Sequence, residues 1–193
     1  MKAVPMNPMA YRNRIHPHKF ALYISFASII MMFGSLTSAY IVKHAAGNWL
    51  EYQMPSIFYL STAVLILSSV CLHYSYYSFT KQKERNYKLF LILAFVLGIG
   101  FVVLQYMGWQ ILYGAGLDLK VNVSGSFLYL ITGLHALHII GGVAGITVAI
   151  IHAFSLPFIV TEKRRIRFQL VLHYWHFVDI LWIYLLAFLL LVK

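Results

Sequence analysis

The chain has 193 residues, of which 61% are hydrophobic and only 10% are charged, and its formal net charge is +10. Soluble domains carry about 25% charged residues, so this composition excludes an ordinary soluble fold. The basic residues stand in short clusters between apolar blocks, without the interleaved aromatic residues of a nucleic-acid surface, so we expect no nucleic acid among the partners. A single cysteine, Cys71, excludes a disulfide framework and a thiolate metal cage within the chain.

Five segments are apolar and long enough to cross a hydrocarbon core, which takes about 20 residues of helix. They are residues 20–42, 55–79, 89–113, 127–154 and 170–192. The connections between them are too short to hold a soluble domain. The sequence therefore predicts an all-α fold, in which residues 1–193 form a single membrane domain: a bundle of five transmembrane helices.

Lysine and arginine residues fall mainly on one side of these spans. Twelve lie before the first span, between the second and third, or between the fourth and fifth, whereas only Lys43, Lys120 and Lys193 lie on the opposite side. Cytoplasmic loops are enriched in Lys and Arg. This bias predicts a cytoplasmic N-terminus and a C-terminus outside.

One acidic residue, Asp179, lies inside a predicted span. It is about 14 Å along the last span at 1.5 Å per residue, where an ionised carboxylate costs about 2.5 to 3.5 kcal/mol on insertion scales. Asp179 therefore needs a partner within the bundle. The geometry allows His138, at a similar depth on the preceding antiparallel helix, and also His176, which lies three residues before Asp179.

The fourth span carries small residues that favour close helix packing. Gly141 and Gly145 have the small-xxx-small spacing that lets a second helix approach, and Gly142 and His138 share their stripe. Two interpretations stay open: a functional polar seam between the fourth and fifth spans, or packing residues that satisfy one another.

Two His-x-x-His pairs suggest an alternative function. His135 with His138 and His173 with His176 could ligate a metal, because neutral imidazole binds haem iron, copper and zinc. A closed site would need histidines alone, or one haem between two helices. The alternative is a histidine-ligated b-type cytochrome or another membrane redox enzyme; a third class is a transporter with Asp179 as its proton carrier.

Two sequence segments carry a family resemblance. The run HYWHFVDILW, from His173 to Trp182, resembles the signature of subunit III of the haem-copper terminal oxidases, which comprise cytochrome c oxidases and quinol oxidases. The run GSFLYLITGLHALHIIGG, from Gly125 to Gly142, resembles the family segment with a His-x-x-His and a small-residue seam. Leu104 and Gln105 match a Leu-Gln pair in the preceding family helix.

The resemblance implies a non-catalytic subunit of a proton-pumping respiratory oxidase that reduces oxygen to water. Such a subunit supports assembly, proton uptake and turnover stability of the catalytic subunit. It contacts subunit I directly and shares the complex with subunit II; haem and copper belong to those partners, and this chain binds no metal and has no catalytic residue. A bound phospholipid is expected. The electron donor, cytochrome c or quinol, stays open.

The candidate site residues are expected to make lipid contacts or form an interhelical seam. They are His135, His138, Gly141, Gly145, Trp175, His176, Asp179 and Trp182.

The chain also departs from the family pattern. It resembles the last five helices of a seven-helix form, as in the shorter bacterial members, which predicts a multi-pass protein of the bacterial cytoplasmic membrane and an incomplete lipid cleft. Gln53, with Glu51 nearby, stands where the family has a membrane carboxylate. Where the family often has Gln-x-x-Glu, this chain has Gln105 followed three residues later by Gly108. The resemblance therefore does not transfer the roles of those carboxylates to this chain.

Overall fold

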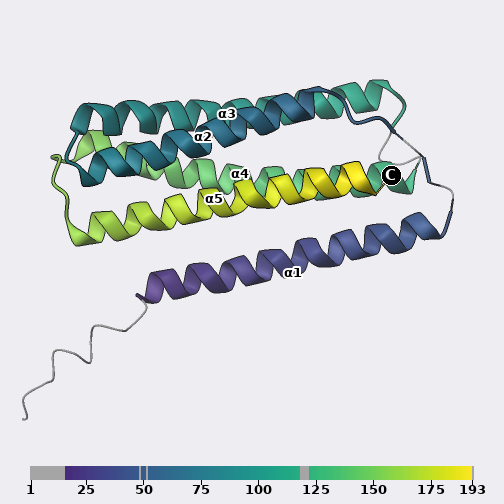
Figure 1. Cartoon of the computed structure of the whole chain (residues 1–193), viewed down its shortest axis with the longest axis horizontal. Coiled ribbons are helices and arrows are strands. Elements are labelled where there is room, and N and C mark those ends of the chain that lie inside the picture. The colour runs from purple at the N-terminus through teal and green to yellow at the C-terminus, as the bar shows by residue number, and fades with distance from the viewer. Residues whose placement is uncertain (1–15, 48, 51, 118–121, 193) are drawn as a thin grey trace, which may run out of the picture.

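The computed structural model describes residues 16–47, 49–50, 52–117 and 122–192. It contains five α-helices in those residues, each long and apolar enough to cross a membrane (Figure 1). The helices are α1 (Pro17–Ala45), α2 (Ile57–Thr80), α3 (Glu84–Gly114), α4 (Val123–Ser155) and α5 (Glu162–Leu191). The predicted all-α bundle of five membrane-crossing helices is confirmed.

Helices α3 and α5 begin well before the apolar stretches that predicted them. Each has a glutamate in its first turn, Glu84 or Glu162, where a negative charge is favourable at the positive end of the helix dipole. Thr161 caps α5, because its side chain accepts a hydrogen bond from the Arg164 backbone N–H at 3.4 Å. Hydropathy marks the lipid-crossing part of a helix, whereas backbone hydrogen bonding continues into its polar first turns.

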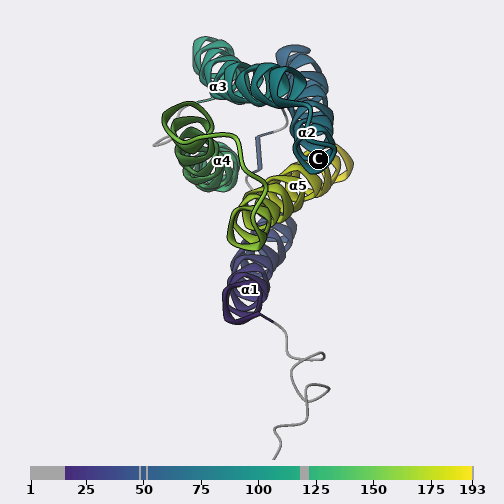
Figure 2. The ribbon, with the colours of Figure 1, turned by 90° about the vertical axis from the view of Figure 1, so that its left-hand side faces the viewer.

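Four helices surround a common centre and the fifth lies outside them (Figure 2). Helix α2 packs on α3 and α5, and α4 packs on α3 and α5. Among the described residues, α1 contacts only α4 and α5. The centre is filled by side chains without solvent exposure, such as Leu65, Leu91, Phe101, Leu128 and Trp182. The site described below lies in this four-helix centre.

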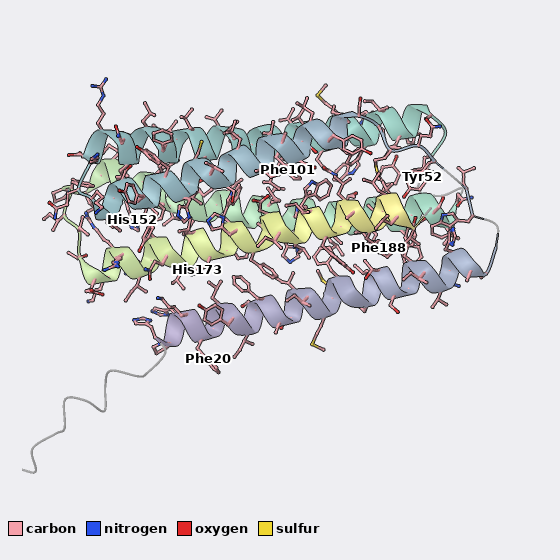
Figure 3. The ribbon with its side chains drawn as sticks, viewed as in Figure 1. Phe20, Tyr52, Phe101, His152, His173 and Phe188 are labelled. Atoms are coloured by element: carbon pink, nitrogen blue, oxygen red, sulfur yellow. The ribbon has the colours of Figure 1, made fainter. Side chains whose placement is uncertain are left out.

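Basic residues gather at one end of the bundle. The N-terminal ends of α1, α3 and α5 and the C-terminal ends of α2 and α4 lie together on the left of Figure 1. All described lysines and arginines except Lys43 belong to that end. In Figure 3, His152 and His173 lie toward this basic end, and Tyr52 and Phe188 toward the other. The cytoplasmic location of the basic end stays a prediction.

Candidate functional site

Trp175 of α5 occupies a slot formed by glycines of two other helices. A Cβ atom on Gly98 of α3 would lie 2.8 Å from the indole Cη2, and one on Gly142 of α4 would lie 2.8 Å from Cε3 and Cζ3. Real Cβ contacts are essentially never so short. Trp175 has no solvent exposure. The slot therefore requires glycine on both sides and fixes α3, α4 and α5 at one level.

The two glycines of the predicted small-xxx-small pair face α5 at ordinary distances. A Cβ on Gly141 would lie 3.5 Å from the Tyr174 hydroxyl, and one on Gly145 would lie 3.7 Å from Val171. Gly142, between them, is the position where α5 approaches closely. The stripe predicted on α4 does meet α5, but its tightest contact comes from the indole and not from helix backbones.

His135 lies in a stack of buried aromatic rings. Its imidazole stacks on Trp182 with ring centroids 4.9 Å apart and 27° between the planes, and the Phe101 ring meets both edge-on. Figure 3 labels Phe101 midway along the bundle. The Trp182 indole N–H donates a 2.9 Å hydrogen bond to the Thr62 hydroxyl of α2. These rings therefore join α3, α4 and α5 and connect them to α2.

The ring nitrogens of His135 are buried and have no hydrogen-bond partner among the described residues. The side-chain amide of Gln105 shares this property. Gln105 lies one turn beyond Phe101 on α3, and one further turn on, Trp109 donates to the Thr132 hydroxyl of α4 at 3.0 Å. Gln105 thus sits at about the same level along the bundle as His135, and the polar atoms of both side chains lack partners among the described residues.

His138 points away from the four-helix centre. Its Nδ1 bonds the Leu134 carbonyl at 2.7 Å, and its ring meets Phe33 of α1 with centroids 5.7 Å apart. The Tyr174 hydroxyl of α5 donates to the His138 backbone carbonyl at 3.0 Å. His138 therefore faces α1, whereas Asp179 faces α2, so the suggested contact between His138 and Asp179 does not describe this arrangement.

Asp179 and His176 meet the same serine of α2. The Ser69 hydroxyl lies 2.6 Å from His176 Nδ1, and it also interacts with the Asp179 carboxyl group. The other nitrogen of the ring, Nε2, lies 3.3 Å from Nδ1 of His73. Asp179 is only 7% exposed. His176, the second suggested partner of Asp179, is thus linked to it through Ser69.

A cavity of about 320 Å³ opens between α4 and α5 at the basic end. Its wall is largely apolar, from side chains such as Phe158 and Phe168, and its basic groups are His152, Arg164 and Arg167. Arg164 Nη1 donates to the Pro157 carbonyl at 2.6 Å and the Ile159 carbonyl at 3.2 Å. The cavity therefore combines a largely apolar wall with cationic side chains.

Within the described part of the chain, no group of three histidine, cysteine, aspartate or glutamate side chains is placed to hold a metal ion. His135 and His138 point to different sides of α4, and the imidazole of His173 bonds the Gln169 carbonyl of its own helix. These three histidines therefore do not converge on one ligand position.

A model of a known protein family matches most of the chain. The family is described as cytochrome c oxidase subunit III, and the match covers residues 48–192. This chain belongs to the cytochrome c oxidase subunit III family. The resemblance seen in the two sequence segments is confirmed.

Individual relatives give the same result. The chain is 32% identical over 126 residues to cytochrome c oxidase subunit 3 of Oryctolagus cuniculus, 32% to that of Struthio camelus and 29% to that of Mus musculus. Each alignment covers 65% of this chain and 46% of the relative. The chain thus spans about half the length of these curated relatives.

The subunit III match includes α2 to α5 and excludes α1. The indole slot, the ring stack and the Ser69 link all lie within the matched residues. Several of their members were not predicted from the sequence: Gly98, Phe101, Thr62, Ser69 and His73. Two sequence signals could have indicated these residues. Ser69 and His73 are polar residues four apart in an apolar span, and Gly98 and Gly100 form a glycine pair in the third span.

Proposed function

We propose that this chain is a non-catalytic subunit III of a proton-pumping haem-copper respiratory oxidase, the complex that reduces oxygen to water. The observation that carries the proposal is the subunit III match, which extends over four consecutive helices. The relatives are cytochrome c oxidase subunits, which favours cytochrome c over quinol as the electron donor.

The proposed direct partner is the catalytic subunit I, with subunit II in the same complex. Large apolar side chains on the outside of every helix support a surface shared between lipid and protein, for example Met31, Val70, Val96, Leu137 and Ile180. Haem and copper are assigned to the partner subunits. The two histidines of the fourth helix support this, because they are engaged separately: His135 in the ring stack, and His138 against Leu134 and Phe33.

The candidate site residues are proposed to hold the helices together, so that the surface offered to subunit I keeps its shape. Trp175 and Trp182 support this role, because each is fully buried and contacts other helices. Aromatic pairs contribute about 0.5 to 1.5 kcal/mol beyond their burial. None of these residues is proposed to take part in chemistry. Support of proton uptake and turnover stability would follow from an intact contact with subunit I.

Phospholipid is the proposed ligand of this chain, at the cavity between α4 and α5. The mixture of aromatic walls and the guanidinium groups of Arg164 and Arg167 supports this assignment. The proposed location is the cytoplasmic membrane of a bacterium, which the resemblance to short bacterial members supports. The charge distribution supports an orientation with the basic end of the bundle inside the cell.

Deleting this chain from the complex tests the proposal. The remaining complex is expected to keep its haem content and initial oxidase activity, while inactivation during turnover becomes faster. The haem absorption spectrum and the decay of oxygen consumption measure the two effects. Loss of all haem from an otherwise assembled complex would contradict a non-catalytic role.

A further inference from the structure

Four polar side chains of α2 and α5 form a continuous series from an exposed position to a buried carboxyl group. His73 is exposed and its Nδ1 lies 3.3 Å from His176 Nε2. His176 Nδ1 lies 2.6 Å from the Ser69 hydroxyl, which also interacts with the Asp179 carboxyl group. His73, His176 and Ser69 are thus each within hydrogen-bonding distance of the next, and Ser69 in turn faces the Asp179 carboxyl group. We call this series the His73–Asp179 chain.

An ionised Asp179 fixes the direction of every hydrogen bond in the His73–Asp179 chain. A carboxylate can only accept, so Ser69 must donate its one hydroxyl proton to it. The Ser69 oxygen then accepts from the Nδ1–H of His176. A neutral imidazole has one donor and one acceptor nitrogen, so His176 Nε2 accepts from the Nδ1–H of His73. The Nε2 of His73 is left as an acceptor.

We propose that the His73–Asp179 chain is a proton relay, which lets the buried Asp179 exchange its proton with the exterior of the bundle through His73. Chains of acidic and histidine side chains inside membranes carry protons in pumps and transporters. This inference goes beyond the proposed oxidase role, because it concerns protons on this chain's own side chains.

The transfer balances with one proton entering and one carboxylate neutralised. A proton binds His73 Nε2, and His73 passes its Nδ1 proton to His176 Nε2. His176 passes its Nδ1 proton to the Ser69 oxygen, and Ser69 passes its hydroxyl proton to the Asp179 carboxylate. Both histidines end neutral in the other tautomer, Ser69 is again a hydroxyl, and Asp179 is a carboxylic acid. Rotation of the rings and the hydroxyl, or transfer in reverse, restores the first state.

Two further features suit a relay. His73 lies seven residues before the end of α2 at Thr80, which is about 10 Å along the helix, and this end of the bundle carries the basic clusters. At the other terminus of the series, Asp179 Oδ1 is buried without a hydrogen-bond partner among the described residues. The series thus runs from an exposed histidine to an acceptor with free capacity.

Infrared spectroscopy after a rapid fall in pH tests the relay. The full chain, with any subunits that co-purify, is placed in lipid nanodiscs, and conversion of the Asp179 carboxylate band to the carboxylic acid band is followed in time. The Asp179→Asn variant assigns the bands. His73→Phe and Ser69→Ala are each expected to slow the conversion by about tenfold or more, because proton access would then depend on local opening of the packed helices.

His173→Phe is the matched control. His173 is an exposed histidine one turn before His176, but its imidazole bonds the Gln169 carbonyl and lies outside the His73–Asp179 chain. The rate in this variant should equal that of the unmodified protein. An unchanged rate in His73→Phe or in Ser69→Ala would overturn the relay, as would an Asp179 carboxylate that keeps its charge throughout the fall in pH.

Discussion

The indole of Trp175 fills the space that a Cβ atom on Gly142 would need. Interiors of proteins are packed as densely as organic crystals, so a single added methyl group at this position has no free volume to enter. Gly98 on α3 imposes the same restriction at other atoms of the ring, because a Cβ there would lie 2.8 Å from Cη2. The position of the Trp175 ring therefore depends on the absence of a side chain at both Gly98 and Gly142.

Gly142→Ala should destabilise the bundle by about 1 to 3 kcal/mol, the usual cost of overpacking. Gly145→Ala is the matched control, because its Cβ would make an ordinary 3.7 Å contact with Val171 and alanine favours helix by about 1 kcal/mol over glycine. Thermal unfolding in detergent measures both. Equal losses in the two variants would show that the slot does not limit packing.

Asp179→Leu should weaken retention of this chain in the purified complex more than Asp179→Asn. Leucine removes the polar interaction with Ser69, and a hydrogen bond contributes about 1 kcal/mol, whereas the asparagine carbonyl can still accept from Ser69. The stoichiometry of the chain after detergent purification measures the effect. Full retention of Asp179→Leu would remove the structural role proposed for this carboxyl group.

His135→Phe should leave stability unchanged or raise it. Both ring nitrogens of His135 are buried without a partner among the described residues, and replacing unpaired polar groups by apolar ones of similar shape is neutral or stabilising. The new ring can still stack on Trp182. Thermal unfolding is again the measurement, with Trp182→Phe as a variant expected to be destabilised, because it loses the bond to Thr62. A marked loss in His135→Phe would reveal a polar partner at that ring.

Arg167→Gln should weaken the binding of an anionic phospholipid by about tenfold, because a hydrogen bond to a charged group contributes about 1.5 kcal/mol. Lys163→Gln is the control of equal charge change, since Lys163 belongs to the same end of the bundle but does not line the cavity. Native mass spectrometry with phosphatidylglycerol measures retained lipid. Equal weakening in the two variants would indicate general attraction to the basic end and not binding in the cavity.

The purified chain should show no stoichiometric haem absorption band. His135 stacks on Trp182, and the imidazoles of His138 and His173 bond carbonyls of their own helices. An absorption spectrum of the chain separated from its partners is sufficient. A Soret band at one haem per chain would favour the alternative b-type cytochrome.

Features that depend on a single helix could be predicted from the sequence. Contacts that depend on how one helix is rotated relative to its neighbours could not. Five spans follow from hydropathy, and Trp175, Asp179 and Trp182 share a face because the helix repeats every 3.6 residues. The partner of Asp179 depends on which side of α2 meets α5, so Ser69 was not predicted and His138 was suggested in its place. Gly98 was missed for the same reason, because its role exists only beside an indole of another helix.

The indole slot also constrains the order in which the bundle can form. Neither Gly98 nor Gly142 alone makes a slot, so the position for Trp175 exists only after α3 and α4 lie side by side. Helix α5 is the last of the five to be synthesised, and by then both walls are already in the membrane. Seating of the ring thus completes assembly of the four-helix centre, and a chain in which α3 and α4 have paired wrongly has no place to accept it.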